Sequence, residues 1–194
     1  MKKIFILCIA AIASYALQSC SGGNKTATSD SVGVTKDSAI KSPPAINTAA
    51  VDSGDTKFAT TAAIGGMAEV ALGKLAQQKS TNTEIQNFGS MMVTDHGKAN
   101  DELKSIAKAK NITLPDSVDA EHKQKMADLS TKTGKDFDRA YVDAMIDGHK
   151  KTLMLMQEEA ASGKDPDLKA FAAKTAPTVQ MHLDAINKIH DGMK

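Results

Sequence analysis

Cysteine, aromatic residues and excess charge are all scarce in this chain of 194 residues. It has two cysteines, no tryptophan, an aromatic content of 4% and a formal net charge of +1. No basic stripe and no aromatic stacking platform stand out, so the composition argues against nucleic-acid binding. The chain also lacks a Gly-rich phosphate loop and the Gly-x-Ser-x-Gly motif of serine hydrolases. The common phosphate-dependent and serine-hydrolase activities are therefore not expected.

Both cysteines lie in the N-terminal segment. Two lysines near the start precede an apolar run, residues 4–17, that is too short to favour a transmembrane helix. The run ends in Leu-Gln-Ser-Cys20, which resembles the lipobox of bacterial lipoproteins. We expect residues 1–19 to be a lipoprotein signal peptide and Cys20 to be the lipidated first residue. Because Ser21 follows it rather than Asp, we expect an outer-membrane anchor that faces the periplasm or the cell exterior.

The segment that follows Cys20 has a linker composition. It is rich in Ser, Thr, Ala and Gly and shows no periodic apolar face, so burial there cannot offset the entropy of ordering. We interpret residues 20–54 as the lipidated cysteine with a disordered linker, and residues 55–194 as one compact domain. That domain contains no cysteine, which excludes a disulfide, a Cys-based zinc site and a thiol nucleophile.

The domain has the periodicity of helices, because its apolar residues recur at intervals of three and four. The expected helices cover residues 55–79, 84–110, 118–129, 135–161 and 166–190. Asp55 and Asp165 are the predicted N-caps of the first and last helices. Pro177 should kink the last helix or loosen one of its turns. The pattern predicts an all-α, ferritin-like four-helix bundle, with the short third helix in the crossover between two hairpins.

Each long helix carries one ionisable side chain in the middle of its apolar face. At about 100° per residue, these side chains are Glu69, His96, His149 and His182. Their distances from the hairpin turns agree to roughly 5 Å at the helical rise per residue. We therefore expect the four groups to meet at mid-bundle, where ferritin-like proteins build metal sites.

Two interpretations of this Glu/His cluster remain open. As a metal site, three imidazoles and one carboxylate would suit a single Zn, Cu, Fe or Mn ion. As a polar network, Glu69 would pair with His96 and His149 with His182, which would only fix the helix register. A di-iron centre is not expected, because valine stands three residues before both His96 and His182, where Glu-x-x-His motifs need a carboxylate.

Three further side chains accompany the cluster. Met92 and Met145 each precede a cluster histidine by four residues. A thioether beside an imidazole favours Cu(I), whereas methionine is also a flexible core filler. Asp95, on the flank of its helix, could orient a ring of a neighbouring helix or make only surface contacts.

Several short motifs occur together in the domain: Gly66-x-x-Glu69, Met92-Val93-x-Asp95-His96, Phe137-Asp138-x-x-Tyr141 and Leu168-Lys169-x-Phe171. With them the chain resembles, over residues 56–190, a bacterial family of exported proteins that carries a domain of unknown function, DUF4142. Members are often described as outer-membrane proteins. The Asp-His pair and the spaced histidines are the most specific marks. The resemblance implies a ferritin-like four-helix bundle and no established enzymatic activity.

The sequence therefore predicts a non-catalytic envelope lipoprotein that binds a metal ion through its Glu/His cluster or acts in envelope stress. The alternative is a structural or interaction module in which the cluster is only a buried polar network. Contact with the membrane through Cys20 is the one partner that the sequence indicates. The sequence is compatible with either a monomer or a homodimer.

Overall fold

The computed structural model describes residues 51–193, which form five α-helices and no strand. The helices are α1 (Ser53–Lys79), α2 (Thr83–Ala109), α3 (Ala120–Ser130), α4 (Gly134–Ser162) and α5 (Pro166–Gly192). The all-α prediction is confirmed, and every expected helix is present close to its expected bounds. The predicted signal peptide, the lipidation site Cys20 and nearly all of the predicted linker lie outside the described residues.

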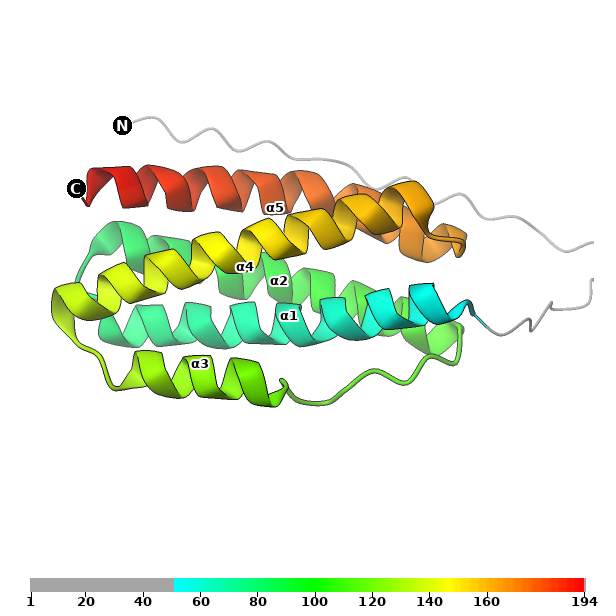
Figure 1. Ribbon diagram of the computed structural model, residues 1–194, viewed down its shortest axis with the longest axis horizontal. Coiled ribbons are helices and arrows are strands. Elements are labelled where there is room, and N and C mark those ends of the chain that lie inside the picture. The colour runs from blue at the N-terminus through cyan, green and yellow to red at the C-terminus, as the bar shows by residue number, and fades with distance from the viewer. Residues whose placement is uncertain (1–50, 194) are drawn as a thin grey trace, which may run out of the picture. The chain divides into compact units, whose positions relative to one another are not determined.

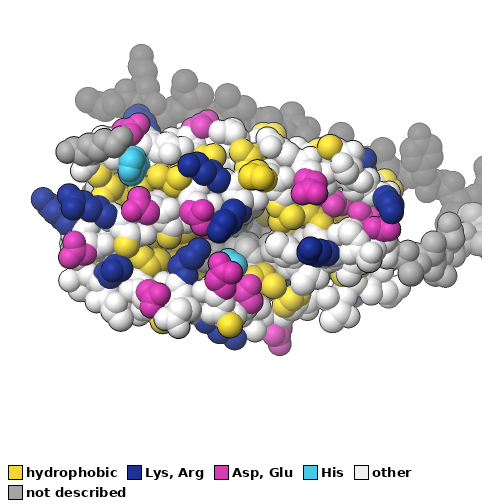
Figure 2. Space-filling view, in the orientation of Figure 1, with side chains coloured by type: hydrophobic (Ala, Val, Ile, Leu, Met, Phe, Trp, Pro, Cys, Tyr) yellow, Lys and Arg dark blue, Asp and Glu magenta, His cyan; other side chains and the backbone are white. Residues whose placement is uncertain are grey.

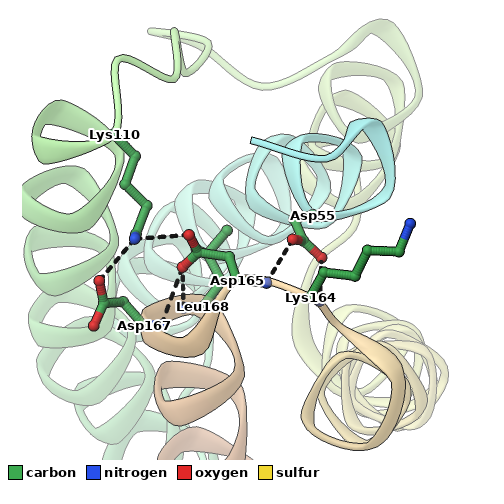
Figure 3. A network of polar contacts seen from close by, with 6 residues as sticks. All are labelled: Asp55, Lys110, Lys164, Asp165, Asp167 and Leu168. Carbon is green, nitrogen blue, oxygen red and sulfur yellow. Dashed lines mark hydrogen bonds and ion pairs between the residues drawn. The ribbon is translucent and has the colours of Figure 1, made fainter. Parts of the chain in front are cut away.

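Helix α1 begins earlier than expected, and its N-cap is Asp52. The Asp52 carboxylate accepts a hydrogen bond from the Gly54 N–H at 2.9 Å, so the prediction of Asp55 as the cap is wrong. Asp55 is buried in the first turn. Its carboxylate accepts hydrogen bonds from the backbone N–H groups of Lys164 at 3.0 Å and Asp165 at 2.7 Å. Asp55 therefore joins the start of α1 to the turn between α4 and α5 (Figure 3).

The same end of the bundle is held by a second set of polar contacts (Figure 3). Asp165 caps α5, as predicted, by accepting hydrogen bonds from the N–H groups of Asp167 and Leu168. The Lys110 ammonium, at the end of α2, lies 2.7 Å from both Asp165 and Asp167. Hydrogen bonding to these carboxylates raises the pKa of Lys110. The end of α2 is thus joined to the start of α5.

The four long helices form a bundle in which each neighbouring pair is antiparallel (Figure 1). Helix α1 packs on α2 and α4, and helix α5 packs on α4 and α2. Short turns join α1 to α2 and α4 to α5. The segment that contains α3 runs back along the outside of the bundle, from the end of α2 to the start of α4. The predicted crossover is therefore present.

Helices α1 and α2 approach each other closely at two glycines. A Cβ atom added to Gly73 would lie 2.6 Å from the carbonyl oxygen of Gly89, and one added to Gly89 would lie 2.6 Å from that of Gly73. Real Cβ atoms do not come this close to an oxygen. The absence of a side chain at both positions permits this backbone contact.

The apolar core consists of two clusters, one toward each end of the bundle. The first includes Leu72, Ile85, Phe88, Met92, Tyr141, Met145 and Ile186. The second includes Phe58, Leu103, Met156, Leu168 and Phe171. On every long helix the predicted ionisable residue falls between the two clusters in sequence. Burial follows the predicted inner faces at most positions. The exceptions, which are only half-buried, are Gly65, Ala99, Ile146, Thr152, Leu153 and Thr175.

Helix α5 continues without a break through Pro177, so the proline does not end the helix. None of the described helices combines the length and apolar character needed to cross a membrane. The face of the domain in Figure 2 intersperses Lys and Arg with Asp and Glu side chains. This face carries no stripe of one charge.

Candidate metal centre

Three histidine rings converge at mid-bundle, each from a different helix. His96 of α2, His149 of α4 and His182 of α5 are 5%, 0% and 0% exposed. Their ring centroids lie 5.3 to 5.6 Å apart. Each ring offers one nitrogen, and these nitrogens all lie within 4.8 Å of one another. The structure thus brings together the three histidines that the sequence placed at one depth.

Hydrogen bonds fix the tautomers of two of these rings. The His149 Nδ1 lies 2.8 Å from the carbonyl oxygen of Met145. Because a carbonyl only accepts, Nδ1 carries the hydrogen and donates it. The His182 Nε2 likewise donates to the Asp95 Oδ2 at 3.1 Å. In a neutral imidazole the other nitrogen then holds a lone pair. His149 therefore presents Nε2 as an acceptor, and His182 presents Nδ1.

One nitrogen on each ring has nothing to bind within the described part of the chain. His96 Nε2, His149 Nε2 and His182 Nδ1 are buried and have no hydrogen-bond partner there. An unsatisfied buried polar atom costs about 1–3 kcal/mol, so the histidines do not form a completed polar network. Imidazole lone pairs are good ligands for Zn, Cu and Fe. The donor set that a bound metal ion would need is present.

Burial keeps the rings neutral. It lowers the pKa of His96 to about 3, with further lowering by the nearby His149 and His182. It lowers the pKa of His149 to about 4. Burial also lowers the pKa of His182, although Asp95 opposes that effect. At neutral pH each ring therefore keeps one nitrogen lone pair, which is the form that binds metals.

Glu69 of α1 lies beside the three histidines and is not one of the group of mutually close donors. Its Oε1 is 3.7 Å from Nδ1 of His149. That nitrogen already donates a hydrogen bond to the carbonyl oxygen of Met145. Its Oε2 is buried without a hydrogen-bond partner among the described residues. Burial raises the pKa of Glu69 to about 8, against the effect of Lys125. Of the four expected ligands, the structure brings the three histidines mutually close, whereas Glu69 lies at the outer edge of the His149 ring.

Of the three residues that accompany the cluster in sequence, Asp95 makes a polar contact, whereas Met92 and Met145 belong to the apolar core. Asp95, on α2, contacts the His182 ring of the neighbouring helix α5. Met92 and Met145 are 0% and 1% exposed and belong to the first apolar cluster. Met145 contacts His149 through its backbone carbonyl. The packing therefore favours the core-filler interpretation of both methionines.

One aromatic residue, Phe88, borders the histidines, and Tyr141 packs against Phe88. The Phe88 ring lies 5.8 Å from that of His149 and 6.5 Å from that of His182. Tyr141 packs against Phe88 at 6.4 Å, and its buried hydroxyl has no partner among the described residues. Burial, together with Glu69, raises the pKa of Tyr141. Residue spacing carries no signal for such contacts, because apolar core positions all look alike in sequence.

Two cavities reach this region from different sides of the bundle. One, of about 390 Å³, lies between α2 and α5, and its lining includes Asp95, His96 and His182. The other, of about 520 Å³, is bordered by α1, α3 and α4, and its lining includes Glu69 and Lys125. The first gives a route to the histidine rings, whereas the second leads to Glu69.

The family model of DUF4142, a domain of unknown function, matches residues 41–189. The chain belongs to the DUF4142 family. This DUF4142 domain is similar to the crystal structure of a DUF305 fragment from Deinococcus radiodurans, with a TM-score of 0.65 and 11% identity. The likeness covers 73% of this chain and 97% of that fragment, and at this identity it bears on the fold alone. No curated protein matches the chain.

Proposed function

We propose that this protein is a non-catalytic envelope lipoprotein whose bundle binds one transition metal ion through His96, His149 and His182. The observation that carries the proposal is the set of three buried rings, each with one ring nitrogen unpaired. A single ion such as Zn, Cu, Fe or Mn would satisfy all three nitrogens at once. Asp95 would orient the His182 ring, as outer residues do in metal sites, and Glu69 would lie behind the His149 ring.

The alternative function is a structural or interaction module in which the cluster only fixes the helix register. Such a network needs a hydrogen-bond partner for every buried polar atom, because an unpaired one destabilises the fold. Of the six buried side-chain atoms without a partner among the described residues, three are nitrogens of these rings. Metal binding would explain why unpaired nitrogens gather at this point, whereas a polar network would not.

The proposal also includes the fold class and the location. Two antiparallel hairpins joined by one long crossover are the topology of ferritin-like bundles, and α1 to α5 are connected in this way. Lipidation at Cys20 would place the bundle at the outer membrane. Metal binding there fits a role in envelope stress.

Metal analysis of the purified full chain tests the proposal. After chelator treatment and loading, we expect one metal ion per wild-type chain and none in the His96→Ala, His149→Ala double variant. Metal at about 100 times its Kd should stabilise the wild type by about 2.7 kcal/mol, which a thermal melt detects as a higher Tm.

The matched control is the His122→Ala, His190→Ala double variant, which removes two histidines outside the cluster. It should bind metal and gain stability as the wild type does. If the wild type binds no ion, or if the cluster variant still binds one, the proposal is wrong. A cluster variant that melts lower, beside a wild type that binds no metal, would establish the structural alternative.

A further inference from the structure

Two large hydrophobic side chains are exposed among the described residues, and both are methionines. Met154 is 69% exposed and Met181 is 50% exposed. Met181 precedes His182 and lines the cavity between α2 and α5 together with His182 and His96. Because both rings are at most 5% exposed, they lie at the inner end of this cavity, and Met181 lies at its mouth.

Met154 has a different neighbourhood. It lines the cavity bordered by α1, α3 and α4. The inner group of that cavity is the carboxylate of Glu69, which is a hard oxygen donor and not an imidazole. The two exposed thioethers are therefore equivalent in chemistry and differ in what lies behind them.

The first cavity offers one soft donor, the Met181 sulfur, beside the carboxylates of Asp95 and Glu102. Thioether sulfur selects Cu(I) over divalent first-row ions, and imidazole also binds copper. The route from Met181 to His96 and His182 thus runs from a soft donor at the surface to imidazole nitrogens inside.

The charge of the ion leads to the same choice. The three histidines bind a metal as neutral ligands, and no carboxylate belongs to the group of mutually close donors. The nearest carboxylates, those of Asp95 and Glu69, lie against the outer nitrogens of His182 and His149, so they offset the charge of the ion only in part. The cost of burying an ion grows with the square of its charge, so a divalent ion costs about four times as much as a monovalent one.

We infer, on the basis of the proposed function, that the metal is Cu(I) and that Met181 is the first ligand it meets on entry between α2 and α5. Met181 captures the ion at the mouth of the cavity. The ion then passes to the three imidazole nitrogens by ligand exchange, with no change of oxidation state. Met181 is thus a loading residue and contributes little to the affinity of the final site.

The test is the rate at which the full chain, under reducing conditions without oxygen, takes Cu(I) from the coloured bicinchoninate complex. Met181→Leu keeps the size and apolar character of the side chain but removes the sulfur. We expect loading to slow by about tenfold, the effect of losing roughly 1.4 kcal/mol of stabilisation during entry. The final copper occupancy and the rate of Zn²⁺ loading should not change.

Met154→Leu is the matched control and should load Cu(I) at the wild-type rate. A wild-type rate in Met181→Leu, or an equal slowing in both variants, would overturn the role of Met181. A wild type that retains Zn²⁺ in preference to Cu(I), when both are offered, would overturn the choice of copper while metal binding by the histidines stands. Failure to bind either ion would overturn the proposed function itself.

Discussion

The chemistry of the single residues depends on which ring nitrogen each hydrogen bond occupies. His149 uses Nδ1 to bind a carbonyl of its own helix, whereas His182 uses Nε2 to bind Asp95 of α2. The two rings therefore present different nitrogens toward each other and toward His96. A metal ion at this point would meet two rings, those of His149 and His182, whose orientation is fixed by hydrogen bonds.

Asp95 is the residue whose removal tests this orientation. In Asp95→Ala the His182 Nε2 loses its acceptor, and the ring is free to change its tautomer or rotate. We expect metal affinity to fall by about 10–100-fold, as is common for residues that orient a ligand. A competition titration against a chelator of known affinity measures this change in metal affinity.

The control for this prediction is Asp101→Ala, on the same helix. Its side chain is 83% exposed and pairs with Lys104 at the surface. The control should keep wild-type affinity. Equal affinities in the Asp95 variant and the wild type would show that the contact has no effect on the site.

The buried acid and the histidines give the metal-free protein opposite responses to pH. The folded pKa of Glu69, about 8, exceeds its ordinary value of 4.5, so stability falls as pH rises through this range. The folded pKa values of His96 and His149, about 3 and 4, lie below the ordinary value of 6.5, so stability also falls as pH decreases below 6.5. Above pH 6.5 the effect of Glu69 dominates.

Glu69→Gln isolates that contribution. From pH 6.5 to pH 8 the wild type should lose up to about 2 kcal/mol, at 1.36 kcal/mol per pH unit. The variant should lose much less, since its amide does not ionise. Glu159, whose burial raises its pKa to about 7, remains in both proteins. Urea unfolding in EDTA at the two pH values measures the difference, and an equal loss in both would contradict the assignment.

Sequence reasoning at this scale identified positions but not partners. Helical periodicity placed the three histidines and Glu69 on inner faces, because burial repeats with the helical turn. It could not assign Asp95 to His182 or Glu69 to the outer edge of His149, because these contacts join residues of different helices. They depend on the lateral placement of the helices, which a single-helix pattern does not contain.

At the scale of the elements, the N-cap of a helix was predicted correctly where the sequence offered one candidate residue for it. Asp165 precedes a proline at the first helical position and caps α5. Near α1 two aspartates compete for the same role, and Asp52 takes it. Asp55 is instead recruited by the turn between α4 and α5. Local sequence gives no sign of this, because Lys164 lies more than a hundred residues further along the chain.

The contact between α1 and α2 gives a prediction about packing. Gly73→Ala would force a Cβ atom against the backbone of Gly89, so we expect a loss of about 1–3 kcal/mol from overpacking. Gly65→Ala on the same helix meets no atom within 4 Å. It should stabilise by about 0.5–1 kcal/mol through helix propensity.

Chemical denaturation of the two alanine variants measures both changes in the free energy of unfolding. The two changes should have opposite signs, so Gly65→Ala is the control for Gly73→Ala. Equal stability changes in the two variants would mean that the helices do not approach closely at Gly73.

At the scale of the whole molecule, the site is a product of the bundle. Its three rings come from α2, α4 and α5, and no two are neighbours in sequence. The sequence could predict their common depth because the hairpin turns and the helical rise fix it. It could not predict that Glu69 stays outside the group of donors, because this depends on how the side chains of different helices meet.

The central claim is that one metal ion is held by the three rings, and anomalous X-ray scattering tests it most directly. Crystals of the metal-loaded chain should show, at the absorption edge of the metal, one peak about 2.0–2.1 Å from each ligand nitrogen. We predict those nitrogens to be His96 Nε2, His149 Nε2 and His182 Nδ1. A peak at His122 or His190 instead, or no peak in a metal-loaded crystal, would contradict the account.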